Sequence, residues 1–153
     1  MSTDAAAYPR PLLVRRNWTS LNGRWLFAFD YERRYSRPAD VASWPLSIEV
    51  PYPPESRASG IDDRGFHPCW WYQRTFEVSP GKGRVILHLG AVDYAATVWV
   101  NHHIVAEHEG GHTPITADIT YALVAGKAQV VTVRAEDDPH DLTKPRGKQD
   151  WQL

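Results

Sequence analysis

The feature that most constrains this chain is a series of short runs in which apolar and polar residues alternate. Alternation of this kind has the period of a β-strand with one buried face. The runs are residues 24–30, 47–50, 70–78, 84–89, 94–100, 104–107 and 129–136. Pro, Gly and Asn separate them, and no long helical periodicity intervenes. The pattern predicts an all-β sandwich or barrel, and long crossing loops favour a jelly roll over a simple meander.

Length and charge exclude several classes of protein. The 153 residues suffice for one domain with a real core. They do not suffice for an additional (β/α)₈ barrel, which needs roughly 250 residues. The formal net charge is −1 and no segment is strongly basic, which argues against a nucleic-acid partner. No run approaches the ~20 apolar residues of a membrane span.

Aromatic residues are abundant, with seven Trp, seven Tyr and four Phe. We expect Trp70, Trp71 and Trp99 to fill the core, although a sugar-stacking platform is an alternative use for a few aromatic rings. Cys69 is the only cysteine, so no intramolecular disulfide can form, and we expect an inert thiol. The first residues, Met1–Asp4, do not have the features that begin a secretory signal peptide. The chain is therefore predicted to be cytoplasmic.

Six short motifs occur in order along the chain. They are residues 21–25 (LNGRW), 71–76 (WYQRTF), 98–101 (VWVN), 108–114 (HEGGHTP), 118–120 (DIT) and 145–149 (PRGKQ). Together they resemble the amino-terminal sugar-binding domain of family 2 glycoside hydrolases, which include β-galactosidases, β-glucuronidases and β-mannosidases. The chain departs from the resembled pattern at His102, where Gly is usual, and at His112 and Ile115, where aromatic residues are common.

The resemblance implies a galactose-binding-domain-like jelly-roll β-sandwich. Residues 1–20 would be an extended lead-in, residues 21–137 the sandwich, and residues 138–153 a polar tail toward absent downstream domains. In the resembled family an immunoglobulin-like domain and a catalytic barrel follow, and two barrel glutamates perform retaining hydrolysis. Neither glutamate has a counterpart here, so we assign no catalytic residue and no cofactor. The expected role is a non-catalytic accessory domain of a β-glycosidase.

The polar tail holds the candidate site residues, Asp141, Arg146 and Gln149. Their side chains offer the forked donors and acceptors that sugar hydroxyls need. They are predicted either to contact sugar or the catalytic domain in the full enzyme, or to belong to a solvated tail. The partners implied are a β-glycoside and the downstream domains, and a homo-oligomer is left open.

Two other segments have rival interpretations. His108 to His112 formally spells H-E-x-x-H, the zinc-protease pattern, but Gly110 and Gly111 oppose the helix that this pattern requires. We therefore expect surface histidines and no metal site. The proline-rich loop 51–68 is long enough to be functional. We favour a loop that packs on a neighbouring domain or subunit over an inert loop or a direct sugar contact.

The sequence leaves two further functions open. A free-standing carbohydrate-binding module would bind sugar in isolation. A protein-interaction β-sandwich would associate without sugar. The identity of the glycoside is not set by these residues, because the resemblance places specificity mostly in the missing barrel.

Overall fold

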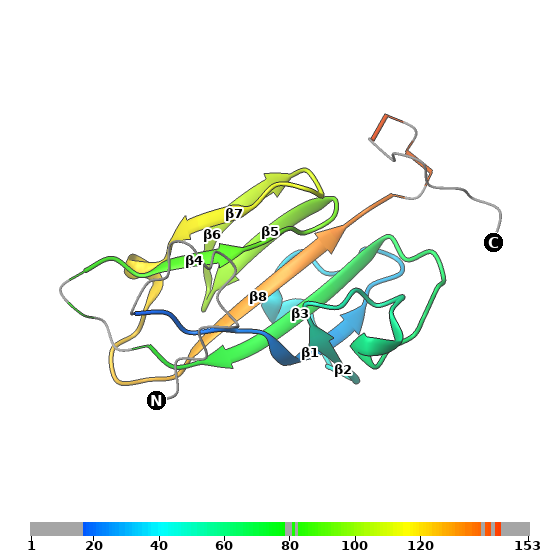
Figure 1. The fold of residues 1–153 in the computed structure, drawn as a ribbon. Helices are drawn as coiled ribbons and strands as arrows, with labels where there is room; N and C mark the ends of the chain where they lie inside the picture. Colours follow the sequence, from blue (N-terminus) through cyan, green and yellow to red (C-terminus); the bar gives the residue numbers. More distant parts are fainter. Residues whose placement is uncertain (1–16, 79–80, 82, 139, 142, 145–153) are drawn as a thin grey trace.

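The structure, a computed structural model, describes residues 17–78, 81, 83–138, 140–141 and 143–144. These residues form eight strands and three short 3₁₀ helices (Figure 1). The strands are β1 (Gly23–Phe29), β2 (Leu46–Val50), β3 (Cys69–Phe76), β4 (Ile86–Leu89), β5 (Ala95–Val100), β6 (His103–Glu109), β7 (Ile115–Asp118) and β8 (Gln129–Glu136). The helices are η3 (Pro38–Asp40), η4 (Arg57–Ser59) and η5 (Thr120–Ala122).

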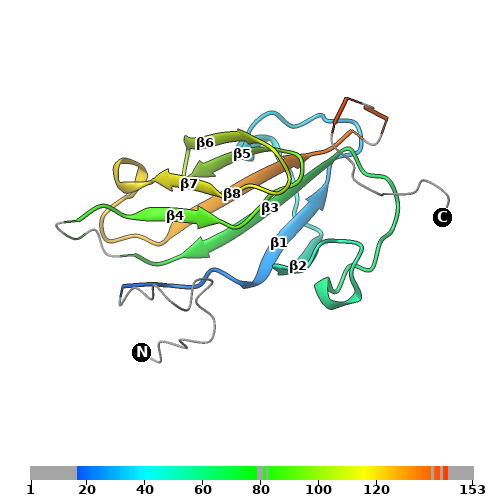
Figure 2. The same ribbon diagram turned by 45° about the horizontal axis from the view of Figure 1, so that its top comes forward.

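The strands build two layers. Six of them form one sheet in the order β2-β1-β3-β8-β5-β6, and β4 pairs with β7 in a second, smaller sheet. Every pairing is antiparallel. Figures 1 and 2 show β4 and β7 side by side on one face of the larger sheet. The predicted all-β sandwich is therefore confirmed.

The main core lies between the two layers. Alternate residues of β1 point into it, as the sequence pattern predicts, with Trp25 and Phe27 almost fully buried. The pairing register places Tyr72 of β3 and Val98 of β5 opposite Val133 of β8, so the same alternation continues across the sheet. The buried members of this core are Trp25, Phe27, Ile48, Leu87, Val98, Val100, Ala117, Ile119, Ala122, Val131 and Val133.

A second core covers the opposite face of the large sheet. Trp71 and Trp99 stack there with ring centroids 5.5 Å apart. Val41 packs against the same cluster, and Tyr35 and Trp44 from the same connection flank it. The connection between β1 and β2 therefore serves as a lid on this face. Its sequence reads as polar and irregular, and nothing in its local pattern reveals this role.

Arg74 breaks the apolar alternation of β3, and the structure explains why. Its guanidinium Nη1 donates to the backbone carbonyls of Leu21, Asn22 and Arg24, at 3.1, 3.0 and 3.3 Å. A charged residue on the core side of a strand is tolerated when hydrogen bonds satisfy it. Arg74 thus fixes the chain as it enters β1. The strand ends at Phe76, two residues before the predicted boundary.

Two further short elements, β7 and η5, lie between β6 and β8. A short 3₁₀ turn, η5, follows Asp118, and the Asp118 carboxylate accepts from the Thr120 amide at 3.0 Å. Strand β7, just before it, was not predicted, because its four residues are too few to show a clear period. In the part of the chain that is described, no helix is long and apolar enough to cross a membrane.

Candidate functional site

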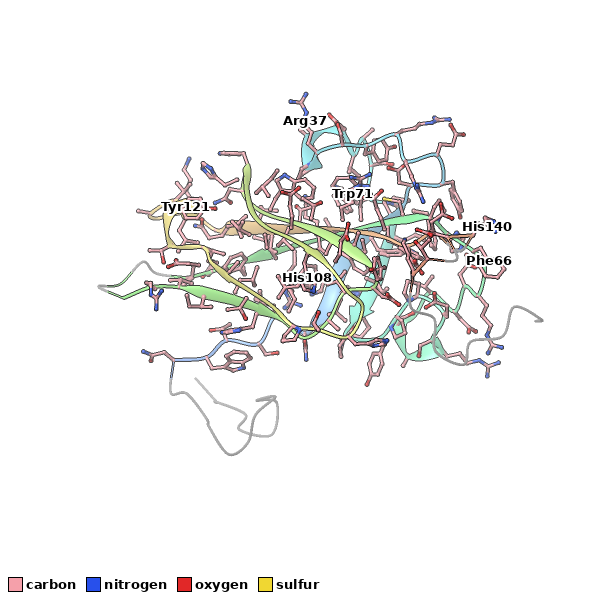
Figure 3. All side chains as sticks on the ribbon, turned by 90° about the horizontal axis from the view of Figure 1, so that it is seen from above. Arg37, Phe66, Trp71, His108, Tyr121 and His140 are labelled. Atoms are coloured by element: carbon pink, nitrogen blue, oxygen red, sulfur yellow. The ribbon has the colours of Figure 1, made fainter. Side chains whose placement is uncertain are left out.

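The sandwich has two differently built ends. We call the end from which β8 departs the exit end; it gathers residues 30–34, 62–68, 93–94, 110–112, 137–138, 140–141 and 143–144. The opposite end, the hairpin end, gathers residues 101–102, 120–124 and 127–129. The antiparallel register sets this division, because Phe29, Trp70 and Ala135 are neighbours across three strands. Figure 3 shows Phe66 and His140 at one end and Tyr121 at the other.

Asp30 organises the chain at the exit end. Its side chain is buried and accepts from the backbone amides of Arg34 and Tyr35, at 2.8 and 3.0 Å. It also accepts from the indole Nε1 of Trp71 at 3.3 Å. These hydrogen bonds hold the turn after β1 against the second core. A buried carboxylate is tolerated here because donors surround it.

The start of the polar tail is attached to the sandwich through Lys144. Its ammonium lies 3.2 Å from Asp137 Oδ1 and 4.9 Å from the centroid of the Tyr94 ring. The Lys144 side chain is only 16% exposed, so its aliphatic stem is covered as well. Arg33 makes a second link, 3.5 Å from Asp138. Asp137, Asp138 and Lys144 are therefore held against the sandwich.

Asp93 lies beside this attachment. Burial is the main cause that raises the pKa of its carboxyl, and the nearby Asp137 carboxylate adds to the rise, while His112 and Lys144 oppose it. A Cβ atom on Gly111 would overlap the Asp93 carboxylate, so any other residue there would require the Asp93 side chain to move. This glycine belongs to the HEGGHTP motif, and its close approach to Asp93 explains the need for it.

Of the three candidate site residues from the sequence, only Asp141 lies within the described residues. It is half-buried, and its carboxylate accepts from the amide and the hydroxyl of Thr143 at 2.9 and 2.6 Å. Arg146 and Gln149 lie outside the described residues. The structure therefore places Asp141 at the exit end, but it does not test the role of the three candidate residues.

An aromatic cluster at the exit end was not anticipated from the sequence. The His67 ring packs between Phe29 and Tyr31, with centroids 4.2 and 5.1 Å away. Tyr31 and Phe66 are 60% and 54% exposed. We call Tyr31, Phe66 and His67 the aromatic shelf. His67 comes from loop 51–68, and no local periodicity could have signalled that a loop histidine is buried against β1.

Some polar atoms in and beneath the aromatic shelf lack hydrogen bonds within the part of the chain that the structure describes. Among the described residues, the indole nitrogen of Trp70 and Nδ1 of His67 are buried without a hydrogen-bond partner, whereas His67 Nε2 lies 3.1 Å from Asp63 Oδ1. The guanidinium Nε of Arg134, near the same end of β8, is likewise buried without a hydrogen bond among the described residues. The Gly65 amide and the His67 ring hold the pKa of Asp63 below its usual value.

At the hairpin end, in contrast, the polar side chains of Asn101 and Gln129 are hydrogen-bonded. Asn101 adopts the left-handed conformation, with φ of 56°, in the turn between β5 and β6. Its side chain donates to Ala122 O and Gln129 Oε1, at 2.7 and 2.9 Å, and accepts from Val130 N at 3.1 Å. Gln129 is fully buried and also bonds the backbone of Val124 in both directions at 2.8 Å.

The histidine-rich segment does not form the helix of a zinc protease. His108 lies on β6, Gly110 and Gly111 follow in the turn, and His108 Nε2 pairs with the Thr113 hydroxyl at 2.8 Å. His102 lies in the hairpin turn, and its ring is 5.8 Å from that of His103, so the two do not point oppositely as strand neighbours would. Among the described residues, no group of three His, Cys, Asp or Glu side chains could hold a metal ion.

Cys69 is fully buried at the start of β3. Burial raises the pKa of its thiol to about 11, with Arg134 partly opposing the rise. A thiol in this state is a poor nucleophile near neutral pH, because the reactive thiolate is scarce. The expectation of an unreactive side chain agrees with this environment.

The architecture defines a β-sandwich module with a polar exit segment and an aromatic shelf beside it. Residues 40–140 match the family described as "Glycosyl hydrolases family 2, sugar binding domain". The chain belongs to that family, and the resemblance found in the sequence is confirmed.

Known relatives and structures agree with this membership. The chain is 35% identical over 135 residues to β-glucuronidase of Canis lupus familiaris, covering 78% of this chain and 20% of that protein. It is 32% identical over 147 residues to β-glucuronidase of Paenibacillus borealis, covering 92% and 24%. Its fold is similar to Faecalibacterium prausnitzii β-glucuronidase, with a TM-score of 0.62, 31% identity, and 77% and 20% coverage. The chain thus spans about a fifth to a quarter of these proteins.

Proposed function

We propose that this chain acts as the non-catalytic domain of a larger retaining β-glycosidase whose substrate is a β-glucuronide. The observation that supports this most strongly is the family match over residues 40–140, joined to relatives that are called β-glucuronidases. These relatives are several times longer than the chain, which leaves room for catalytic domains beyond the sandwich. The domain boundary near residue 137 stays a prediction.

Within this role, the exit end faces the rest of the enzyme. Asp141 is held there by the segment that Lys144 attaches to the sandwich, and we keep Asp141, Arg146 and Gln149 as candidate contacts to sugar or to the catalytic domain. The downstream immunoglobulin-like domain and barrel are the proposed partners, and a homo-oligomer is compatible. A reducing compartment such as the cytoplasm suits a chain whose single cysteine is a buried free thiol.

Enzymatic assays with two proteins test the proposal. The longer polypeptide encoded by the same gene is expected to hydrolyse an aryl β-D-glucuronide in preference to the matching galactoside and mannoside. The 153-residue chain alone is expected to hydrolyse none of them. Hydrolysis by the chain alone, or a longer polypeptide inactive on all three substrates, would contradict the proposal.

Asp141→Asn in the longer polypeptide tests the site residue. A contact to substrate predicts a raised KM or a lowered kcat with an unchanged melting temperature. Asp138→Asn is the matched control, because Asp138 is a neighbouring exposed carboxylate that pairs with Arg33. Equal kinetics for wild type and Asp141→Asn would remove Asp141 from the site.

The alternative of a free-standing carbohydrate-binding module remains testable with the chain alone. Calorimetric titration with glucuronic acid and with β-linked oligosaccharides would detect it. Sugar binding in the micromolar range by the isolated chain would favour this alternative over a role completed only within the longer enzyme.

A further inference from the structure

The aromatic shelf exposes more apolar surface than its surroundings explain. Tyr31 and Phe66 are both more than half exposed, although each belongs to a segment fixed by hydrogen bonds. Asp30 fixes the turn beside Tyr31, and Asp63 accepts from the Gly65 amide at 2.8 Å just before Phe66. Large apolar side chains held in place at a surface commonly mark a contact site.

Unsatisfied polar atoms gather beneath the same shelf. The Trp70 indole nitrogen can only donate, and it has no acceptor among the described residues. His67 Nδ1 likewise has no hydrogen bond among them, whereas His67 Nε2 lies 3.1 Å from Asp63 Oδ1, and the His67 and Trp70 rings lie 6.5 Å apart. Buried polar groups in folded proteins are nearly always paired. Among the described residues, hydrogen bonding at the shelf is therefore left incomplete at Trp70 Nε1 and His67 Nδ1.

The chain leaves the sandwich alongside this shelf. The Asp137 amide donates to Pro68 O at 3.2 Å, directly after His67 in the loop, and Arg33 pairs with Asp138. Residues 137 and 138 therefore leave β8 beside the shelf. Relatives are several times as long as this chain. A downstream domain is the occupant that this geometry supplies at the highest local concentration.

We propose that the aromatic shelf is the docking face for a downstream domain of the same polypeptide. This inference rests on the proposed function, because it needs the longer chain. The docked surface is expected to place apolar side chains over Tyr31 and Phe66. It is also expected to bring a carbonyl or carboxylate acceptor toward the Trp70 indole, with small adjustments of loop 62–67.

Thermal unfolding of Phe66→Ala in two contexts tests the docking. In the 153-residue chain, removal of an exposed ring is expected to change the melting temperature by less than about 2 °C. In the longer polypeptide, the same change is expected to lower the melting temperature of this domain by about 4 °C or more, because buried aromatic residues dominate interfaces. Tyr121→Ala is the control, a similarly exposed aromatic at the hairpin end, and is expected to behave alike in both contexts.

Each other outcome overturns the inference. Equal small shifts for Phe66→Ala in both contexts would show that nothing downstream covers the shelf. A Phe66-dependent dimer of the 153-residue chain would assign the shelf to a second copy, and Phe66-dependent binding of glucuronic acid by that chain would assign it to sugar. Hydrolysis of an aryl β-D-glucuronide is measured in the same samples. Active enzyme without the context-dependent shift refutes docking alone, and the shift without hydrolysis refutes the proposed function alone.

Discussion

The hairpin end and the exit end of the sandwich use buried polar residues in opposite ways. At the hairpin end, Asn101 and Gln129 satisfy each other and the backbone around them. At the exit end, Trp70 Nε1 and His67 Nδ1 are buried without a hydrogen bond from the described residues. Because paired buried groups stabilise and unpaired ones cost free energy, the described residues complete the first end but not the second. The difference indicates which end is built to meet another surface.

The largest expected effect is at Gln129. Substitution Gln129→Leu removes acceptors and donors that serve Asn101 and Val124, and leaves these groups buried and unpaired. We expect the free energy of unfolding to fall by about 3 kcal/mol, measured by urea titration. The control is Gln73→Leu, at a half-buried glutamine bonded to Thr132 at 3.2 Å, which is expected to lose about 1 kcal/mol. Equal losses at the two sites would contradict the central place of Gln129.

Asn101→Ala is expected to cost about 2 kcal/mol, from lost hydrogen bonds and from a left-handed backbone that alanine disfavours. Asn101→Gly separates the two causes, because glycine accepts the φ of 56° and lacks the side-chain bonds. Recovery of most of the lost stability by glycine would show that conformation dominates. Little recovery is the expected result.

At the exit end, Lys144→Met is expected to cost about 1 kcal/mol at low salt, since the ion pair with Asp137 is partly exposed and screened. The difference from wild type should shrink in 1 M NaCl, as checked by parallel urea titrations. A cost that does not depend on salt would indicate that the contact of Lys144 with the Tyr94 ring carries most of the effect.

His67→Phe is expected to keep the stability within about 1 kcal/mol of wild type, because an apolar ring keeps the packing and removes the unpaired Nδ1, but also removes the contact of Nε2 with Asp63. His67→Ala, which removes the ring, is expected to cost about 2 kcal/mol by leaving a cavity. If His67→Phe were as harmful as His67→Ala, the nitrogens would have partners that stabilise the fold.

The smallest expected effect concerns pH. The folded-state pKa of Asp93 is raised, so its ionisation opposes folding once the pH exceeds that pKa. Asp93→Asn is therefore expected to be slightly more stable than wild type at pH 7. The advantage should vanish as the pH falls below the ordinary aspartate pKa of 3.8, where both proteins are neutral at this position. Stability curves against pH for the two proteins test the sign.

The sequence predicted the hairpin end far better than the exit end. Asn101 stands between two alternating runs, so local rules identify the turn and its left-handed residue. The strands of the main core follow from the same period-two pattern. Gln129 opens the last predicted strand, but its network with Asn101 depends on a contact between residues 28 positions apart.

At the exit end the important groups come from irregular segments. Tyr31 and His67 are 36 residues apart and meet only because β1 and β3 pair. The lid formed by residues 35–44 likewise depends on tertiary packing against Trp71. Asp141 was singled out for its chemistry, and the tail around it shows too little periodicity for its placement to follow from sequence.

The most direct test compares amide hydrogen exchange in the 153-residue chain and in the longer polypeptide. Incompleteness of the exit end predicts that amides of residues 62–67 exchange at least about tenfold more slowly in the longer polypeptide, since docking protects them. Amides of residues 120–124 at the hairpin end should exchange equally in both. Equal exchange of residues 62–67 in the two proteins would contradict the claim that this end is completed by another part of the polypeptide.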